Sequence, residues 1–235
     1  MSRPIAIFRH YPTEGPGTLA DFLTQAGQPW TLVALDQGMS VPAEASDFSG
    51  LVFMGGPMSV NDDLDWIEPE LRLIRQAVAL NIPVLGHCLG SQLMCKALGG
   101  VVGPNPHREI GWGAIQVAEH ALARHWFGQQ RSPVVFHWHG ETWSLPPGAR
   151  LLAGNEACAH QAFALGVHLG LQCHVEMTAA DVQCWCLNGQ SEIEANPGPW
   201  VQPVAHIQQL LEPRLQALRT VANQLYGVWL QGLRP

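Results

Sequence analysis

Cys88 stands in a pentapeptide that is typical of a nucleophile elbow. Residues 86–90 have the pattern Gly-x-Cys-x-Gly, after an apolar segment and before a helical one. A sharp strand-to-helix turn strains its central residue, and flanking glycines remove the Cβ atoms that would collide there. We therefore expect Cys88 to project from the end of a strand, where a thiolate can attack a carbonyl carbon.

Backbone N–H groups near this turn could assist such an attack. A helix beginning at Leu89 would point its free N–H groups and positive dipole end at the sulfur, which favours the thiolate. The N–H of Leu89 could also bind the oxyanion of a tetrahedral intermediate. A second glycine-rich turn, residues 54–57, follows the neighbouring strand, and Gly56 could donate there as well. Each peptide alone also fits an ordinary turn in a protein without catalytic activity.

His174 and Glu176 are the preferred partners of this cysteine. They end an apolar segment and are two residues apart, so in extended backbone they project to the same side. A thiolate nucleophile needs an imidazole that accepts and returns protons, and a carboxylate can fix the tautomer of that imidazole. His137 and His139 share a face in the same way and remain alternatives for the base, although pocket wall is their expected role.

Short apolar segments alternate with longer helical ones and must position these groups. The sequence predicts strands over residues 5–8, 31–35, 50–54 and 82–85, and helices over 66–80 and 89–98. Repeated strand-helix-strand units predict a parallel sheet with right-handed crossovers and helices on both faces. An active site would then lie beyond the carboxyl ends of the strands.

The second half of the chain predicts an antiparallel or mixed extension of the same sheet. Strands are expected over residues 110–117, 132–138, 150–153, 161–165 and 167–173. An amphipathic helix is expected over 203–229, with a possible break at Pro213. No linker-like or repeated segment interrupts the pattern, so we expect residues 1–235 to form a single α/β domain with a mostly parallel, mixed sheet.

Composition excludes several functional classes. Hydrophobic residues make up 47% and charged residues 13%, which predicts a large core, and the net charge of -7 comes with no basic run that would bind nucleic acid. Neither a signal peptide nor an apolar stretch of about 18 residues is evident, which predicts a cytoplasmic protein with no membrane partner.

The six cysteines are expected to be reduced. Neither Cys184 and Cys186 nor the histidines have zinc-site spacing, so no metal and no cofactor are expected.

Five peptides, taken in order, resemble the class I (triad) glutamine amidotransferases, and in particular free-standing proteins similar to the glutaminase domain of GMP synthase. Within about residues 50–178 they are MGGP (54–57), PVLGHCLGSQ (83–92), EIGW (109–112), HWHGE (137–141) and GLQCHVE (170–176). The resemblance implies a flavodoxin-like architecture and opening of the γ-amide of glutamine through a cysteine thioester. The sequence departs from the family at Cys173 and Val175, in place of an aromatic residue and proline, and at Glu141, in place of aspartate.

The resemblance also implies roles for individual residues. Cys88 would be the nucleophile, His174 the general base and Glu176 its orienter, while Gly56 and Leu89 would form the oxyanion hole. The substrate would be held by Gln92, Gly55, His139 and Gly140.

Three functions are consistent with these features. The first is a glutaminase that releases ammonia for a separate acceptor, such as a synthetase subunit, because the sequence ends soon after the amidotransferase pattern and has no phosphate-binding loop. The second is a γ-glutamyl hydrolase or peptidase that acts on γ-glutamyl amines or dipeptides by the same route. The third is a non-catalytic binding or regulatory protein with this fold.

Overall fold

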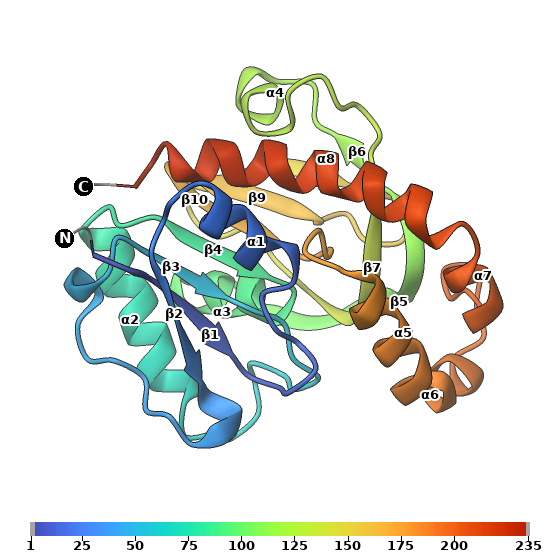
Figure 1. Ribbon diagram of the computed structural model, residues 1–235, viewed down its shortest axis with the longest axis horizontal. Coiled ribbons are helices and arrows are strands. Elements are labelled where there is room, and N and C mark those ends of the chain that lie inside the picture. The colour runs from blue at the N-terminus through green and yellow to red at the C-terminus, as the bar shows by residue number, and fades with distance from the viewer. Residues whose placement is uncertain (1–2, 234–235) are drawn as a thin grey trace.

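Buried apolar strands form the centre of an eight-stranded sheet in the computed structural model, which describes residues 3–233. The strands of this sheet are β1 (Ile5–Arg9), β2 (Trp30–Ala34), β3 (Gly50–Phe53), β4 (Val84–His87), β6 (Gln116–Val117), β8 (Arg150–Gly154), β9 (Ala162–Leu165) and β10 (His168–Leu171). Their order is β2-β1-β3-β4-β10-β9-β8-β6, and the first five are parallel while the last three pair antiparallel (Figure 1). The expected mostly parallel, mixed sheet is confirmed.

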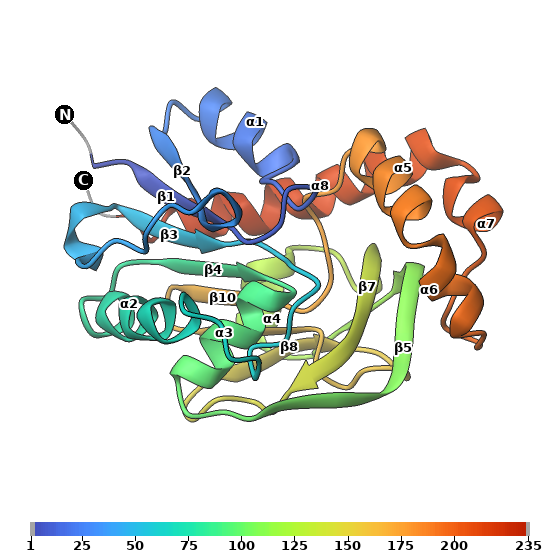
Figure 2. The ribbon, with the colours of Figure 1, turned by 90° about the horizontal axis from the view of Figure 1, so that it is seen from below.

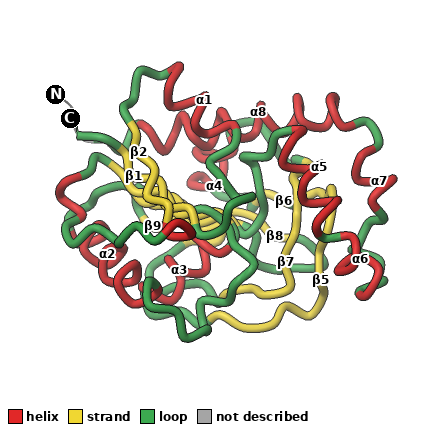
Figure 3. The backbone as a smooth tube through the Cα atoms, turned by 60° about the horizontal axis from the view of Figure 1, so that its bottom comes forward, coloured by secondary structure: helices red, strands yellow, loops and turns green. Residues whose placement is uncertain are grey.

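Helices cover both faces of this sheet, as Figure 3 shows. One face carries α1 (Thr18–Gln25), α4 (Ala121–Phe127) and α8 (Leu211–Leu230), and the other carries α2 (Ile67–Ala79) and α3 (Leu89–Ala97). Successive strand residues enter opposite cores: Ile7 joins the cluster that contains Leu19, whereas Phe8 joins the cluster that contains Leu71. Because both faces are covered, the central strands are apolar throughout rather than alternating.

A separate two-stranded ribbon stands beside the main sheet and corrects one expectation. β5 (Val102–Ala114) and β7 (Val134–Trp143) form a two-stranded sheet of their own, next to α5 (Ala179–Asn188), α6 (Gln190–Ala195) and α7 (Val204–Gln208) (Figure 2). The expected strand 110–117 is divided between β5 and β6, which lie in different sheets, and 132–138 corresponds to β7 rather than to an extension of the main sheet. Side-chain alternation cannot reveal this, because it is the same whichever strand becomes the partner.

Some element boundaries also differ from expectation. β4 begins at Val84, two residues later than predicted, and the predicted helix 203–229 is divided into α7 and α8. The division lies at Gln209 and Leu210, where Leu210 has φ +54°, and Pro213 falls inside the first turn of α8. Proline fits there because the first-turn N–H groups have no intrahelical acceptor. None of the helices within residues 3–233 has the length and apolar character needed to cross a bilayer.

Two glycines let α3 pack directly on the strands that precede it. A Cβ atom on Gly90 would lie 2.0 Å from the carbonyl oxygen of Phe53 in β3, and one on Gly86 would lie 2.5 Å from the carbonyl carbon of Gly90. Backbone therefore meets backbone at both positions, and neither contact can be relieved by a rotamer change.

Gly90→Ala should lower the free energy of unfolding by about 3 kcal/mol, because the new methyl group must displace β3 or α3. Gly227→Ala is the matched control: a Cβ at this position in α8 would meet no heavy atom within 4 Å. Alanine has a higher helix propensity than glycine, so this variant should have a free energy of unfolding up to about 1 kcal/mol higher than wild type. Urea unfolding at constant m-value measures both, and equal stability of the two variants would contradict the packing argument.

Candidate active site

Cys88 occupies the strained turn between β4 and α3. Its φ is +47° and its ψ is -108°, a conformation that costs a residue with a side chain about 1–3 kcal/mol. Hydrogen bonds hold the turn: the Cys88 N–H donates to the carbonyl of Leu171 at 2.7 Å, and the N–H of Ser91 donates to the carbonyl of Cys88 at 2.9 Å. The thiol lies at the wall of a cavity of about 640 Å³.

The cavity lies beyond the carboxyl ends of the central strands. Its walls come from the loops after β1 and β3, the Cys88 turn, the β5–β7 ribbon, and the segment of α5 and α6. Of the residues expected in the site, those that line the cavity are Cys88, Gly56, Gln92, His139 and Gly140.

The two expected oxyanion donors lie next to each other. A Cβ on Gly56 would come within 2.7 Å of the side chain of Leu89, the first residue of α3. Gly55 lies slightly deeper, where a Cβ would be 3.2 Å from Cε1 of His174. The glycine turn after β3 is therefore packed between the start of α3 and the His174 ring.

His174 and Glu176 are in direct contact. Nδ1 of His174 lies 2.5 Å from Oε1 of Glu176, while the other carboxylate oxygen accepts the N–H of Val175 at 2.9 Å. Burial lowers the pKa of His174, but the Glu176 carboxylate and the nearby Cys88 side chain outweigh burial and hold this pKa well above its ordinary value. Burial opposes ionisation of Glu176 as well, yet His174 lowers the Glu176 pKa to about 2. Nε2 of His174 is buried and has no hydrogen-bond partner within residues 3–233.

Two sheets hold His174 in place. It follows β10 in the main sheet, and its backbone exchanges hydrogen bonds of 2.8 and 3.2 Å with Phe136 of the ribbon. Trp185 of α5 packs edge-on against the imidazole, with ring centroids 4.8 Å apart. The imidazole is thus fixed by its backbone, its carboxylate partner and an aromatic wall.

His137 and His139, the alternative bases, face a different acidic group. Burial lowers the pKa of His137 to about 4, and its Nε2 lies 3.3 Å from the carbonyl of Gly113. His139 lines the cavity, with Nδ1 3.0 Å from the Glu141 carbonyl and Nε2 3.0 Å from the Glu109 carboxylate. The Nδ1 contact and the nearby Glu109 carboxylate hold His139 against the ribbon, which suits a wall residue better than a base.

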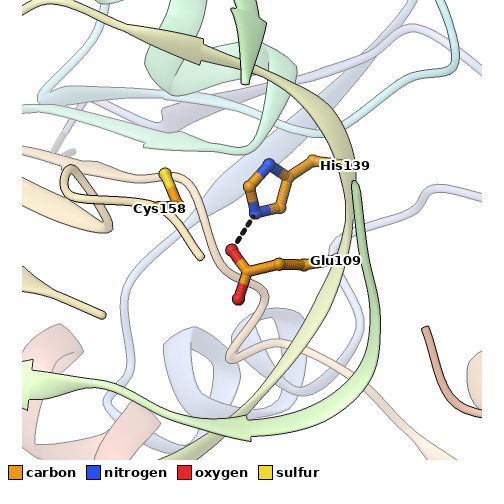
Figure 4. Close-up of side chains that lie close together, drawn as sticks. All are labelled: Glu109, His139 and Cys158. Carbon is orange, nitrogen blue, oxygen red and sulfur yellow. Dashed lines mark ion pairs between the residues drawn. The ribbon is translucent and has the colours of Figure 1, made fainter. Parts of the chain in front are cut away.

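Glu109, His139 and Cys158 form a buried polar cluster below this wall (Figure 4). Their ligand atoms lie within 4.8 Å of one another, a spacing that a metal ion could use. However, Asn155 and Gln161 donate to the two Glu109 oxygens at 2.7 and 2.6 Å, and the Cys158 sulfur lies 3.3 Å from the carbonyl of His160. Burial raises the pKa of the Cys158 thiol, which disfavours the thiolate that a metal needs. Hydrogen bonding explains this cluster, which joins the ribbon to the loop before β9.

Several residues that contact the site escaped the sequence analysis. Nε2 of Gln172 lies 3.5 Å from the Cys88 sulfur, and Nε2 of Gln92 donates to Gln172 at 3.3 Å. Gln172 is two residues before His174, so period-two alternation could have placed it on the same face. Glu14 and Arg108 also line the cavity, but their segments carry no local signal that marks them.

Known proteins with similar sequences include glutamine amidotransferases. Residues 18–181 match the family described as glutamine amidotransferase class-I. A putative glutamine amidotransferase-like protein, YfeJ of Salmonella typhimurium, is 32% identical over 206 residues, which cover 84% of this chain and 86% of that protein. A GMP synthase [glutamine-hydrolyzing] of Azoarcus sp. is 31% identical over 140 residues, 55% of this chain but only 26% of the synthase.

A solved structure extends the similarity over the whole chain. The crystal structure of a glutamine amido transferase from Methylobacillus flagellatus has a TM-score of 0.97 and 41% identity, covering 100% of this chain and 96% of that one. A glutamine amidotransferase structure from Thermotoga maritima, 24% identical with a TM-score of 0.87, shows the same fold over 98% of this chain and 99% of that one. The chain belongs to the class-I glutamine amidotransferase family.

Proposed function

We propose that this protein hydrolyses the γ-amide of glutamine through a thioester on Cys88. The observation that carries the proposal is the placement of a strained cysteine at the wall of a cavity, near an imidazole that a buried carboxylate orients. The raised pKa of His174 fits a group that forms an imidazolium beside a thiolate.

The reaction follows from these groups. The Cys88 thiolate forms a C–S bond to the amide carbon, and the carbonyl electron pair moves onto the oxygen, where the N–H groups of Gly56 and Leu89 stabilise it. His174 gives its Nε2 proton to the amide nitrogen as the C–N bond breaks and ammonia leaves. Water then attacks the thioester while His174 takes one of its protons, which releases glutamate and restores the thiolate. Glu176 keeps His174 oriented throughout.

The amino-acid end of glutamine would lie against the ribbon side of the cavity. Gln92, His139 and Gly140 line this side, and the Arg108 guanidinium lies over Gly140, where a Cβ would be 2.8 Å away. Glu141 is held at 3.1 Å by the hydroxyl of Ser59. A guanidinium and a carboxylate in one wall can bind the α-carboxylate and the α-ammonium group of an amino acid. Arg108 and Glu141 thereby add two charged groups to the substrate contacts proposed for Gln92, His139, Gly140 and Gly55.

Ammonia from this site would pass to a separate protein. The similarity to the amidotransferase part of GMP synthase supports a synthetase as the acceptor, because this chain spans about a quarter of that relative.

We also propose that residues 1–235 form one domain, since a single central sheet organises both cores of the described residues 3–233.

The size of the cavity favours a second substrate class. About 640 Å³ lies in the range that holds a drug-sized ligand and leaves room beyond a bare glutamine. γ-Glutamyl amines, in which a larger group replaces one amide hydrogen, would use the same residues and the same thioester.

Cys88→Ala should abolish glutamate release from glutamine, a loss of at least about 10⁴-fold, because no other group supplies the nucleophile. Cys184→Ala is the matched control, since Cys184 is the least buried thiol and does not line the cavity. A coupled glutamate assay compares the variants with wild type. Equal rates in wild type and Cys88→Ala on glutamine and on γ-glutamyl amines would show that catalysis does not use Cys88.

Glu176→Gln should lower kcat by about 10³-fold with a smaller change in KM, because an amide cannot stabilise the His174 imidazolium. The Glu176 carboxylate raises the His174 pKa, so its removal lowers that pKa and the imidazolium is lost at lower pH. The basic limb of the kcat/KM profile should therefore move toward acid. A basic limb at the same pH in both proteins would show that Glu176 does not control the pKa of His174.

A further inference from the structure

We propose that Glu14 contacts the leaving group of the substrate and selects γ-glutamyl amides whose leaving amine carries no carboxylate: glutamine itself and γ-glutamyl amines, rather than γ-glutamyl dipeptides. This inference rests on the proposed thioester chemistry and adds the substrate class to it. The geometry points to the leaving group because Glu14 lies beside the imidazole that would protonate it.

Glu14 and His174 approach the same point above Gly55. A Cβ on Gly55 would lie 2.2 Å from Oε2 of Glu14 and 3.2 Å from Cε1 of His174. In an imidazole, Cε1 lies between Nδ1, which Glu176 holds, and the unpartnered Nε2, which would give its proton to the departing nitrogen. The Glu14 carboxylate is therefore on the leaving-group side of the site, beside the imidazole that would protonate the departing nitrogen.

The loop that carries Glu14 is firmly anchored. At its start, His10 lies 3.0 Å from Glu70 of α2, and both side chains are fully buried. In its middle, Trp185 donates to the Thr13 carbonyl at 2.9 Å. At its end, the Thr18 N–H donates to the Glu176 carbonyl at 2.8 Å. Three attachments, one of them to the residue that orients His174, hold Glu14 at a defined position.

Gly17 is required for the last of these attachments. Its φ is +49°, and a Cβ there would lie 2.1 Å from the Glu176 carbonyl oxygen. A side chain at this position would push the loop away from the segment that carries His174 and Glu176. Glycine at position 17 thus lets the end of the loop over residues 10–17 approach residues 174–176 closely.

The charge of Glu14 is not neutralised by a direct partner. No hydrogen-bond donor within residues 3–233 contacts its carboxylate, although the side chain is partly buried and lines the cavity. Burial raises its pKa to about 7; the charged groups that face it are His174 and His10, which lower this pKa, and Glu176, which raises it. An unpaired acid in a cavity attracts an ammonium or amide N–H and repels a second carboxylate.

Aromatic rings surround the same part of the cavity. Tyr11, Trp138 and Trp185 line it, and the two indoles meet edge to face with centroids 6.0 Å apart. Ring faces next to a carboxylate suit the alkyl chain or the cationic group of an amine. The leaving group of a γ-glutamyl dipeptide would instead bring its own carboxylate against Glu14.

Alkylation of Cys88 tests this without requiring turnover. Iodoacetamide is neutral and iodoacetate carries one negative charge. Both reagents alkylate the thiolate, so the ratio of their rate constants does not depend on the fraction of Cys88 that is ionised. Glu14→Gln should raise the iodoacetate-to-iodoacetamide ratio at pH 8 by about tenfold, as expected for one charge removed from the wall of the cavity that the Cys88 sulfur lines. Asp63→Asn, an exposed position outside the cavity lining, should leave the ratio unchanged. Fragment-ion mass spectrometry reads Cys88 separately from Cys95.

The same ratio should depend on pH in wild type. Glu14 is neutral below pH 7 and charged above it, so the ratio should fall between about pH 6 and pH 8 and should show no such step in Glu14→Gln. Steps that belong to His174 or His10 would persist in both proteins. An equal ratio in wild type and Glu14→Gln at every pH would overturn the assignment of Glu14.

Turnover gives the second measurement. Wild type should prefer glutamine and γ-glutamylethylamide over γ-glutamylglycine in kcat/KM, and Glu14→Gln should reduce that preference by about tenfold. An unchanged preference would overturn the role of Glu14 and leave Cys88 chemistry intact. Hydrolysis of no γ-glutamyl compound by wild type would instead overturn the proposed function, and the alkylation ratio would still report whether Glu14 repels a carboxylate near Cys88.

Discussion

The structure depends most on the close contact between backbones at the turn that carries Cys88. Gly90 rests on the carbonyl of Phe53, and Gly86 rests on Gly90, so α3 starts immediately above β3 and β4. This packing over-determines the turn and keeps Cys88 at φ +47°, a conformation that the residue would not adopt alone. This packing fixes the Cys88 backbone relative to the sheet. The segments that follow the other central strands therefore lie at defined positions relative to Cys88.

The imidazole side of the site comes from a junction between two sheets. β10 carries the chain to His174 from the main sheet, and Phe136 of the ribbon pairs with His174 itself. The loop after β1 is also joined to the segment that follows β10, because the Thr18 N–H donates to the carbonyl of Glu176. Segments separated by more than 150 residues thus meet at one backbone position, which explains why the acidic side chain of Glu14 lies next to a histidine far along the chain.

Charges in the cavity are arranged in two groups with different surroundings. On the ribbon side, Arg108 pairs with Glu192, and Glu141 accepts a hydrogen bond from Ser59, so these charges are partly compensated. Beside His174, Glu14 has no such donor within residues 3–233, and burial raises its pKa to about 7. A site with this asymmetry can bind a zwitterionic end of a substrate on one side and discriminate by charge on the other.

Local periodicity and glycines at fixed spacing were enough to predict the parallel half of the sheet, the helices on both faces and the strand-turn-helix around Cys88. A spacing of two residues in extended backbone was also enough to pair His174 with Glu176. Three features are visible only in the folded chain: β5 and β7 form a sheet of their own, Gln172 reaches the Cys88 sulfur, and Glu14 faces His174. Those features arise from contacts between distant segments, and the choice of partner for a strand or loop is set by the whole fold rather than by its own residues.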